Sequence, residues 1–358
     1  MHDIANKNNV TFVLPNAHLG GAERVLVTIA NAAAAEKFTV TIILLKAEGP
    51  LLEHISNDIQ IIDLKVTKTR FGLYKLIKAL RNGSAQIIIS TTCRMNFLTL
   101  LAAKLTFRKL LVIAREPNNP AKTHQNTGKI VLAAYKFLYK SAHRIIAQTP
   151  EMKQSIHKFY GVKNNNIIFA QNPVDSQKIK YQASITKNPY SNYAYTFIFV
   201  AIGRLAIQKR YDLMLKAFSQ AFRAEDSVGL FILGKGPLLS DLQELSLKLK
   251  INKKVNFLGQ VPNPYPYIKW ANSLCSSSDY EGFPNTIIEA SVLGTPVITT
   301  ESTPYLVDFV RKTKMGTTVP CNNCQALSNE LQKFTKNLPK FEPSNYTFQF
   351  KELLEQIV

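Results

Sequence analysis

The chain has 358 residues, of which 46% are hydrophobic, and its mean hydropathy of −0.05 is that of a soluble globular protein with room for two domains of ordinary size. No run of about 18 uncharged apolar residues occurs, the first nine residues lack the apolar segment of a signal peptide, and there are four cysteines. We therefore expect neither a membrane-spanning protein nor a disulfide-rich secreted one, but a protein of a reducing compartment.

The net charge of +20 is concentrated in the first half of the chain. Residues 1–180 contain 25 Lys and Arg against 10 Asp and Glu, and no acidic residue lies between Asp63 and Glu116. Such an excess of positive charge creates a positive electrostatic potential that favours an anionic partner. An anionic membrane surface is one candidate, a solvated basic face is another, and nucleic acid is disfavoured because no aromatic recognition pattern, zinc finger or recognition helix accompanies the charge.

The first half reads as strands alternating with helices. A buried strand at 10–14 is followed by a glycine-rich turn at Gly20 and Gly21 and by a helix that ends at Ala35. Further strands are predicted at 40–45, 59–64, 87–90, 110–114, 144–147 and 166–170, and further helices at 71–81, 96–106, 129–141 and 150–160. This spacing predicts one parallel, doubly wound α/β sheet.

Between residues 176 and 194 the apolar residues lose their regular spacing, and a second series of alternating strands and helices follows. Its predicted strands are 195–202, 228–233, 255–258, 274–277 and 296–299, and its helices are 211–223, 238–249, one that starts near Pro284, and two in the tail at 326–334 and 346–357. We therefore expect a first domain at 1–175, a linker at 176–194 and a second domain at 195–358, whose last helix could pack back on the first domain.

Two glutamates with seven residues between them, Glu281 and Glu289, stand in a loop and in the helix after it. Pro284 suits the first helical position and Gly294 the helix end. The unpaired N–H groups of the helix start favour a phosphate, and the two carboxylates can accept hydrogen bonds from two hydroxylated groups of one ligand. A nucleotide sugar has that shape.

Two cations stand after the first strand of the second series. Arg204 and Lys209 flank the turn before the next helix, where both can reach a phosphate and stabilise a departing diphosphate without a metal, although either alone is more often a surface cation. The match of Gly229 to Lys235 with a phosphate-binding loop is spurious, because the strand itself fills the spacing and Gly236 replaces the required Ser or Thr. Gly234 and Gly236 instead indicate a tight turn.

No metal site is predicted. Cys321 and Cys324 form a C-x-x-C, but no second cysteine pair or histidine pair completes a zinc set. The six histidines form no catalytic pattern, and only His18 and His124 lie in loops that could line a crevice.

Together these motifs resemble the retaining glycosyltransferase family 4, whose members have the GT-B fold of two facing Rossmann-like domains. The resemblance runs from Gly20-Gly21-Ala22-Glu23-Arg24 through Gly203-Arg204-Leu205 with Lys209, and through Gly234-Lys235-Gly236-Pro237, to Glu281 and Glu289. It implies that Glu289 binds the ribose, that Glu281 lies by the donor sugar, and that Arg204 and Lys209 hold the diphosphate. Other donor-binding residues are then Gly20, Gly21, Gly203, Gly234, Gly259, Phe283, Pro284 and Asn285.

Two departures from the family pattern stand out. The loop after the strand at 110–114 lacks the usual histidine, so His18, Arg115, Glu116 and Asn118 are candidates for acceptor or donor-sugar contacts. Arg210 stands where a glycine often follows the phosphate-binding lysine, a change that we expect to be harmless.

The resemblance implies transfer of a hexose or N-acetylhexosamine, most simply from a UDP-sugar, to a saccharide acceptor with retention of configuration and without a metal or other cofactor. We expect a lipid-linked acceptor in envelope polysaccharide or glycoconjugate assembly, and a cytoplasmic protein at the inner face of the membrane. The alternatives are a non-catalytic GT-B protein that binds a nucleotide or glycan, a basic nucleic-acid-binding protein, and a sugar-nucleotide epimerase, for which we find no acid and base pair.

Overall fold

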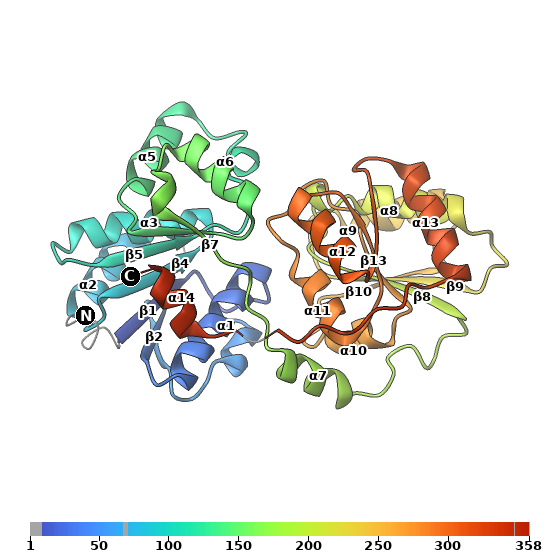
Figure 1. Ribbon diagram of the computed structural model, residues 1–358, viewed down its shortest axis with the longest axis horizontal. Coiled ribbons are helices and arrows are strands. Elements are labelled where there is room, and N and C mark those ends of the chain that lie inside the picture. The colour runs from blue at the N-terminus through green and yellow to red at the C-terminus, as the bar shows by residue number, and fades with distance from the viewer. Residues whose placement is uncertain (1–8, 67–70, 347, 358) are drawn as a thin grey trace. The chain divides into compact units, whose positions relative to one another are not determined.

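The computed structural model describes residues 9–66, 71–346 and 348–357, and these form two compact units. Unit 1 contains the described residues up to Pro173 together with those from Phe348 onward, and unit 2 contains residues 174–346. Each unit is an α/β structure with one parallel sheet, as predicted (Figure 1).

The sheet of unit 1 has seven parallel strands in the order β3-β2-β1-β4-β5-β6-β7. Its inner strands are buried runs rich in Val, Ile and Leu, which are typical of a sheet covered on both faces, whereas the edge strand β3 is largely exposed. In chain order its strands are β1 (Asn9–Leu14), β2 (Thr39–Leu44), β3 (Gln60–Asp63), β4 (Ile87–Thr91), β5 (Leu111–Arg115), β6 (Arg144–Ala147) and β7 (Ile167–Phe169).

Helices cover both faces of this sheet (Figure 1). One face packs against α2 (Gly72–Asn82), α3 (Cys93–Leu105), α5 (Lys129–Tyr139) and α6 (Pro150–Tyr160). The other face packs against α1 (Gly21–Ala35) and α14 (Phe350–Ile357). The 3-10 turns η1 (Pro50–His54) and η3 (Asn164–Asn166) and the short helix α4 (Pro120–Thr123) lie in connections.

Unit 2 has six parallel strands in the order β10-β9-β8-β11-β12-β13. The strands are β8 (Phe197–Ile202), β9 (Val228–Leu233), β10 (Val255–Gly259), β11 (Ser273–Ser276), β12 (Val297–Thr300) and β13 (Gly316–Val319). The helical elements are α7 (Ser176–Ser184), η4 (Ile207–Lys209), α8 (Tyr211–Ala221), α9 (Leu239–Lys248), α10 (Tyr265–Trp270), α11 (Asn285–Leu293), α12 (Pro304–Thr313) and α13 (Cys324–Lys336).

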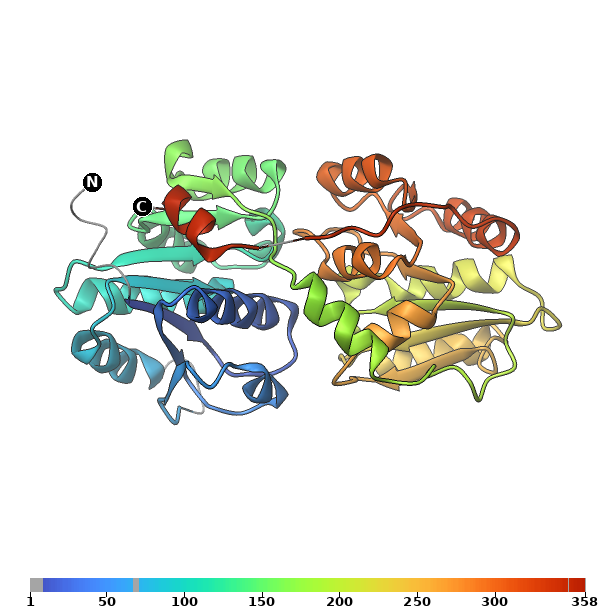
Figure 2. The ribbon, with the colours of Figure 1, turned by 60° about the horizontal axis from the view of Figure 1, so that its bottom comes forward.

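The segment 176–194, expected as a linker, contains helix α7, which packs beside α10 (Figure 2). Ile179 and Ala183 on this helix, and Tyr190 after it, are buried in unit 2. The sequence did not predict α7 because its composition is polar. A helix that buries only one narrow stripe of side chains has few regularly spaced apolar residues.

Helix α12 and strand β13 were not predicted. Thr303 before Pro304 does form the start signal of a helix, with Pro304 at its first position. Gly316–Val319 is short and polar except for its last residue, and it is a strand because it pairs with β12 in parallel register.

Helix α14 belongs to unit 1, where Phe350 and Ile357 are fully buried against the sheet face that α1 covers. Its first two N–H groups, on Phe350 and Lys351, donate to the carboxylate of Glu36 at the end of α1. A carboxylate at a helix start is favourable, because it satisfies unpaired donors and meets the positive end of the helix dipole.

Within the described ranges, no helix combines the length and the apolar character needed to cross a membrane.

Candidate functional site

The strand order of unit 2 reverses between β8 and β11, which pair directly with each other. The chain goes from β8 outward to β9 and β10, and then returns to the other side of β8 for β11, β12 and β13. In open α/β sheets, ligands bind outside the carboxyl ends of strands at such a reversal. The loops after β8 and β11 carry Arg204, Lys209 and Glu281, so the structure gathers these predicted residues at that point.

Hydrogen bonds hold these two loops together. The hydroxyl of Ser277 lies 2.8 Å from the carbonyl oxygen of Lys209 and 2.9 Å from that of Arg210. The N–H of Asp279 donates to the carbonyl of Gln208 at 2.9 Å, and the Gln208 amide donates to the carbonyl of Tyr280 at 2.6 Å. The side chains that project from the two loops are therefore fixed relative to each other.

Lys209 and Glu281 form an ion pair at this point, through Nζ and Oε1. Their side chains are 24% and 9% exposed, so the pair is largely shielded from solvent. The family resemblance implies that they contact different groups of the donor, the diphosphate and the sugar. The structure brings the ammonium and the carboxylate into contact, which places a cation and a hydrogen-bond acceptor side by side at the carboxyl ends of β8 and β11.

Arg210 follows Lys209 with a left-handed backbone, at φ 49° and ψ 42°. This conformation suits glycine, which explains why a glycine is usual at such a position. The guanidinium compensates through its contacts: Nε donates to Asp212 at 3.0 Å, Nη1 donates to Asp279 at 3.2 Å, and Nη1 also donates to the side-chain oxygen of Asn322. Arg210 thus connects the loops after β8, β11 and β13, a role that the sequence did not indicate.

Glycines allow the neighbouring loops to lie close together. A Cβ on Gly234, whose φ is +144°, would lie 1.9 Å from the carbonyl oxygen of Gly203, and a Cβ on Gly236 would lie 2.2 Å from that of Leu205. The N–H of Gly234 donates to the carbonyl of Gly259 at 2.7 Å. These contacts agree with the predicted tight turn, and they place Gly203, Gly234 and Gly259 in one stack of loops at the carboxyl ends of three strands.

Helix α11 begins at Asn285, one residue after Pro284, and ends at Gly294, whose φ is +73°. Glu289 lies in its second turn and is 3% exposed. Phe283 is also buried, and its ring packs against Tyr305 and Phe309. Phe283 therefore anchors the loop that leads to the helix, and only its backbone is left to approach a ligand.

Arg204 is exposed after β8, and it forms no ion pair with any residue in the part of the chain that the structure describes. Its position at the carboxyl end of the strand, one residue beyond Gly203, leaves the guanidinium available to a diphosphate.

In unit 1 the predicted Gly20 and Gly21 follow β1 and begin helix α1. The carboxylate of Glu23 lies against Gly20, since a Cβ there would meet Oε2 at 2.0 Å. Burial raises the pKa of Glu23, an effect opposed by its own backbone N–H and by the nearby charges of Arg115 and His18. His18 itself is exposed, with Nε2 3.7 Å from Glu48.

Arg115 and Glu116, predicted to contact acceptor or donor sugar, are both buried at the carboxyl end of β5, at 2% and 1% exposure. The carboxylate of Glu116 accepts hydrogen bonds from Tyr139 and from the Asn96 amide, the latter at 3.0 Å. Burial raises the pKa of Glu116 to about 7, and burial lowers that of Arg115 to about 10. The sequence did not identify the partners Asn96 and Tyr139, which lie on helices α3 and α5.

The guanidinium of Arg115 donates to Thr91 at 3.1 Å and to the side-chain oxygen of Asn172 at 2.5 Å. Asn172 stands just before the chain leaves unit 1, and its amide in turn donates to Gln148 at 3.0 Å. Arg115 therefore links the ends of β4 and β5 to the segment that precedes the crossing into unit 2.

Of the other loop candidates, Asn118 is half-buried and His124 is buried. His124 Nε2 lies 3.0 Å from both Cys93 Sγ and the Tyr160 hydroxyl. Burial raises the pKa of the Cys93 thiol to about 12, which favours the protonated thiol over the nucleophilic thiolate.

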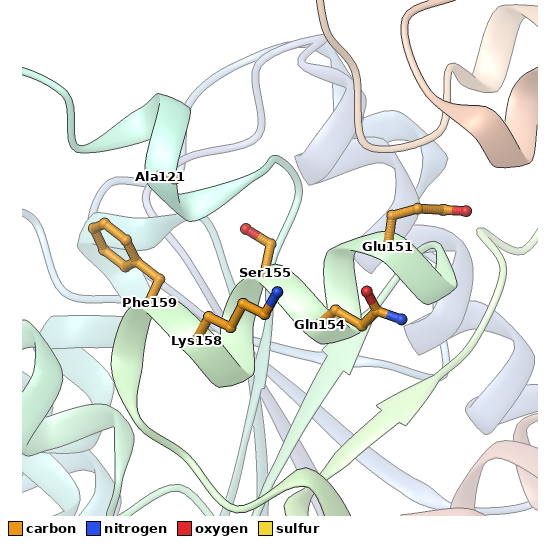
Figure 3. Close-up of a pocket in the computed structure, with 6 residues that line it drawn as sticks. All are labelled: Ala121, Glu151, Gln154, Ser155, Lys158 and Phe159. Atoms are coloured by element: carbon orange, nitrogen blue, oxygen red, sulfur yellow. The ribbon is translucent and has the colours of Figure 1, made fainter.

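An open groove of about 440 Å³ runs between α4 and α6. Figure 3 shows its lining, with Phe159 at one end of a row along α6 and Glu151 at the other. Because only two residues separate the end of β6 from the start of α6, the groove adjoins the carboxyl side of the sheet, where open α/β sheets generally bind ligands. Its lining residues are Ala121, Glu151, Gln154, Ser155, Lys158 and Phe159.

Among the residues that the structure describes, no three His, Cys, Asp or Glu side chains come together as a possible metal site. The four cysteines are free, and Cys324 is near Gln220 while Cys321 faces the backbone after β11.

Comparison with known families gives matches over most of the chain. The family model "Glycosyltransferase Family 4" matches residues 19–178, and the model "Glycosyl transferases group 1" matches residues 185–344.

Among curated relatives, an uncharacterized glycosyltransferase of Methanocaldococcus jannaschii is 30% identical over 239 residues, which cover 64% of this chain and 58% of that protein. A Campylobacter jejuni α-1,4-N-acetyl-D-galactosaminyltransferase, whose name specifies a GalNAc-containing saccharide on PP-undecaprenol, is 26% identical over 90% of this chain and 88% of its own length.

Among solved structures, that of HepE from Anabaena in complex with UDP and glucose superposes with a TM-score of 0.76, at 16% identity over 92% of this chain and 90% of HepE. At this identity the likeness concerns the fold, and it confirms the predicted GT-B type.

Proposed function

The chain belongs to the glycosyltransferases of family 4 and group 1, and on this basis we propose that it moves a hexose or N-acetylhexosamine from a UDP-sugar to a lipid-linked saccharide, with retention of anomeric configuration. The observation that carries the proposal is the gathering of Arg204, Lys209 and Glu281 at the strand-order reversal of unit 2.

In the proposed reaction, an acceptor hydroxyl oxygen bonds to the anomeric carbon while the bond from that carbon to the diphosphate breaks, and the hydroxyl proton passes to the departing UDP. Negative charge grows on the diphosphate as the bond breaks. Arg204 and Lys209 supply fixed positive charge there, and such charge aimed at a developing anion is usually the largest catalytic contribution. Glu289 binds the ribose, and Glu281 contacts the transferred sugar while holding Lys209 in place.

Two relatives support the choice of substrates. HepE was crystallised with UDP and glucose and also with UDP-glucose, which favours UDP as the carrier. The Campylobacter N-acetylgalactosaminyltransferase is named for an acceptor attached to undecaprenol through a diphosphate. A lipid-linked acceptor also agrees with the basic first half of the chain, since it would lie at an anionic membrane surface, and we place the protein at the cytoplasmic face of that membrane.

The groove between α4 and α6 is our candidate for acceptor contacts. It combines an aromatic ring, Phe159, with the polar side chains of Gln154, Ser155 and Lys158. A few polar groups beside an apolar wall are the usual composition of a small-ligand site.

The test is a donor screen with purified protein, which scores release of UDP and transfer to lipid-linked saccharides extracted from the source cell. We expect transfer from one UDP-sugar and its loss in Arg204→Ala. Thermal stabilisation by UDP without any transfer would support the non-catalytic alternative and contradict the proposal.

A further inference from the structure

The outer surface of α3 and α5 in unit 1 combines exposed apolar side chains with lysines. The two helices pack side by side, and Nζ of Lys104 on α3 lies 5.0 Å from the ring centre of Phe137 on α5. We call this outer face the α3–α5 surface, and its exposed side chains are Lys104, Leu105, Phe107, Lys129, Ile130 and Phe137.

Helix α5 is apolar on two sides. Its inner side buries Tyr135, Leu138 and Tyr139 in the core. On its outer side Ile130 and Phe137, seven residues apart and therefore on one stripe, are 88% and 67% exposed. The outer side of a surface helix is normally polar. An apolar outer stripe indicates that a partner covers it.

Phe107 adds an independent observation. It follows the last turn of α3 with φ 56°, in the left-handed region, and its side chain is 91% exposed. Glycine is the usual residue at this position after a helix, and a bulky side chain there is strained. Burial in the fold does not account for a phenylalanine at this point, so a role outside the fold is the simpler explanation.

The charge of this region is of one sign. Glu116 is the single acidic residue in the sequence between Asp63 and Glu151, and its carboxyl group is buried. The lysines of the α3–α5 surface therefore have no exposed carboxylate from this stretch to neutralise them, and their partner should be anionic.

The partner should also contain an apolar region that can cover the exposed apolar side chains of this surface. Aliphatic side chains such as Leu105 and Ile130 do not stack on bases, which argues against nucleic acid. They do partition into the boundary between lipid headgroups and acyl chains, where neighbouring lysines gain from anionic headgroups.

We propose that the α3–α5 surface binds an anionic lipid bilayer, with Phe107, Ile130 and Phe137 inserted at the interface and Lys104 and Lys129 at the headgroup phosphates. The proposal rests on the proposed function in one respect, that a lipid-linked acceptor gives the protein a reason to bind there. Its test needs no sugar transfer, so the two can fail separately.

The experiment is cosedimentation of the full chain with phosphatidylcholine vesicles, with and without phosphatidylglycerol. We expect binding only to the anionic vesicles. Phe107→Gly should lower the partition coefficient about tenfold, in keeping with the loss of one inserted aromatic ring. Lys104→Ala and Lys129→Ala should each lower it about fivefold. Because glycine suits the backbone at 107, Phe107→Gly should fold at least as stably as the natural chain.

The matched controls lie in unit 2. Leu247→Ser changes an apolar side chain of α9 that is 59% exposed, and Lys336→Ala removes an exposed lysine of α13. Both should bind vesicles like the natural protein. Equal binding by Phe107→Gly and the natural chain, equal binding to neutral and anionic vesicles, or no vesicle binding at all would overturn the proposal, as would a preference for oligonucleotides over anionic vesicles.

Discussion

Nη1 of Arg210 lies 3.2 Å from Oδ1 of Asp279, two residues before Glu281. This contact links the residue after Lys209 to the loop that holds its ion-pair partner, so Arg210 positions the pair although it need not touch a substrate.

We predict that Arg210→Gly lowers kcat by about ten- to a hundredfold, because small displacements of charged groups in an active site have effects of that size. Stability should change by only about 1 kcal/mol. Relief of the left-handed backbone strain, about 1–3 kcal/mol, offsets the loss of partly exposed ion pairs worth about 0.2–1 kcal/mol each.

Steady-state kinetics and urea unfolding measure the two effects. Arg210→Lys is the matched variant, since it keeps a charge and the strain but not the forked guanidinium, and its turnover should be intermediate. Natural turnover in Arg210→Gly would show that the contact has no positioning role.

Glu289 and Arg204 should differ in which step they affect. Glu289→Gln should weaken UDP binding by about ten- to a hundredfold, as expected from hydrogen bonds to a charged group worth about 1.5–3 kcal/mol. Arg204→Ala should lower kcat by about a hundred- to a thousandfold with a smaller effect on binding. Titration calorimetry with UDP and initial rates separate the two, with Arg311→Ala of α12 as the control. Full transfer by both variants would refute the site.

Gly234 and Gly259 both have positive φ, so alanine variants at these two positions form a matched pair for measuring the free energy of unfolding. At Gly234 a Cβ would meet the backbone of Gly203, whereas at Gly259, with φ +69°, no atom lies within 4 Å of the added carbon. Gly234→Ala should therefore cost about 3 kcal/mol or more of unfolding free energy, and Gly259→Ala about 1 kcal/mol. Chemical denaturation measures both, and equal losses would contradict the close loop packing.

Glu116 should make stability depend on pH. Its folded pKa of about 7 exceeds the ordinary 4.5, so between these values the folded protein keeps a proton that the unfolded chain has lost. Stability then falls as pH rises through this range and levels off above it, by an amount on the order of 3 kcal/mol. Glu116→Gln, which cannot ionise, should lack this component. Denaturation of both proteins from pH 4.5 to 8 tests it, and parallel profiles would count against it.

Transfer should not need a divalent cation, because Arg204 and Lys209 supply the charge that a metal otherwise provides to a diphosphate. Activity after treatment with EDTA should equal that before it. Loss of activity that Mg²⁺ restores would show that these cations do not suffice.

The sequence predicted the regular parts of the fold well, because buried strands such as Val228–Leu233 and helices such as Pro150–Tyr160 have clear apolar patterns and turn residues at their ends. It did not predict the pairing of Lys209 with Glu281. That contact joins residues 72 positions apart and exists because β8 and β11 are neighbours, and strand order is not contained in any local pattern.

The burial of Glu116 was missed for a similar reason. Arg115-Glu116-Pro117-Asn118 has the composition of an exposed loop, but Tyr139 and Asn96 reach it from two helices of the covering layer. A polar residue that is buried by distant partners has no signature in its own segment.

The return of the last helix to unit 1 has a consequence for biosynthesis. Phe350, Leu353, Leu354 and Ile357 complete a core whose other buried members lie before residue 150, while all of unit 2 is translated in between. A ribosome-bound chain can therefore finish the second sheet while the first still exposes an apolar face. The N-terminal sheet is synthesised first, but one of its faces is the last to be fully covered. A nascent chain stalled before residue 350 would leave that apolar face exposed to chaperones.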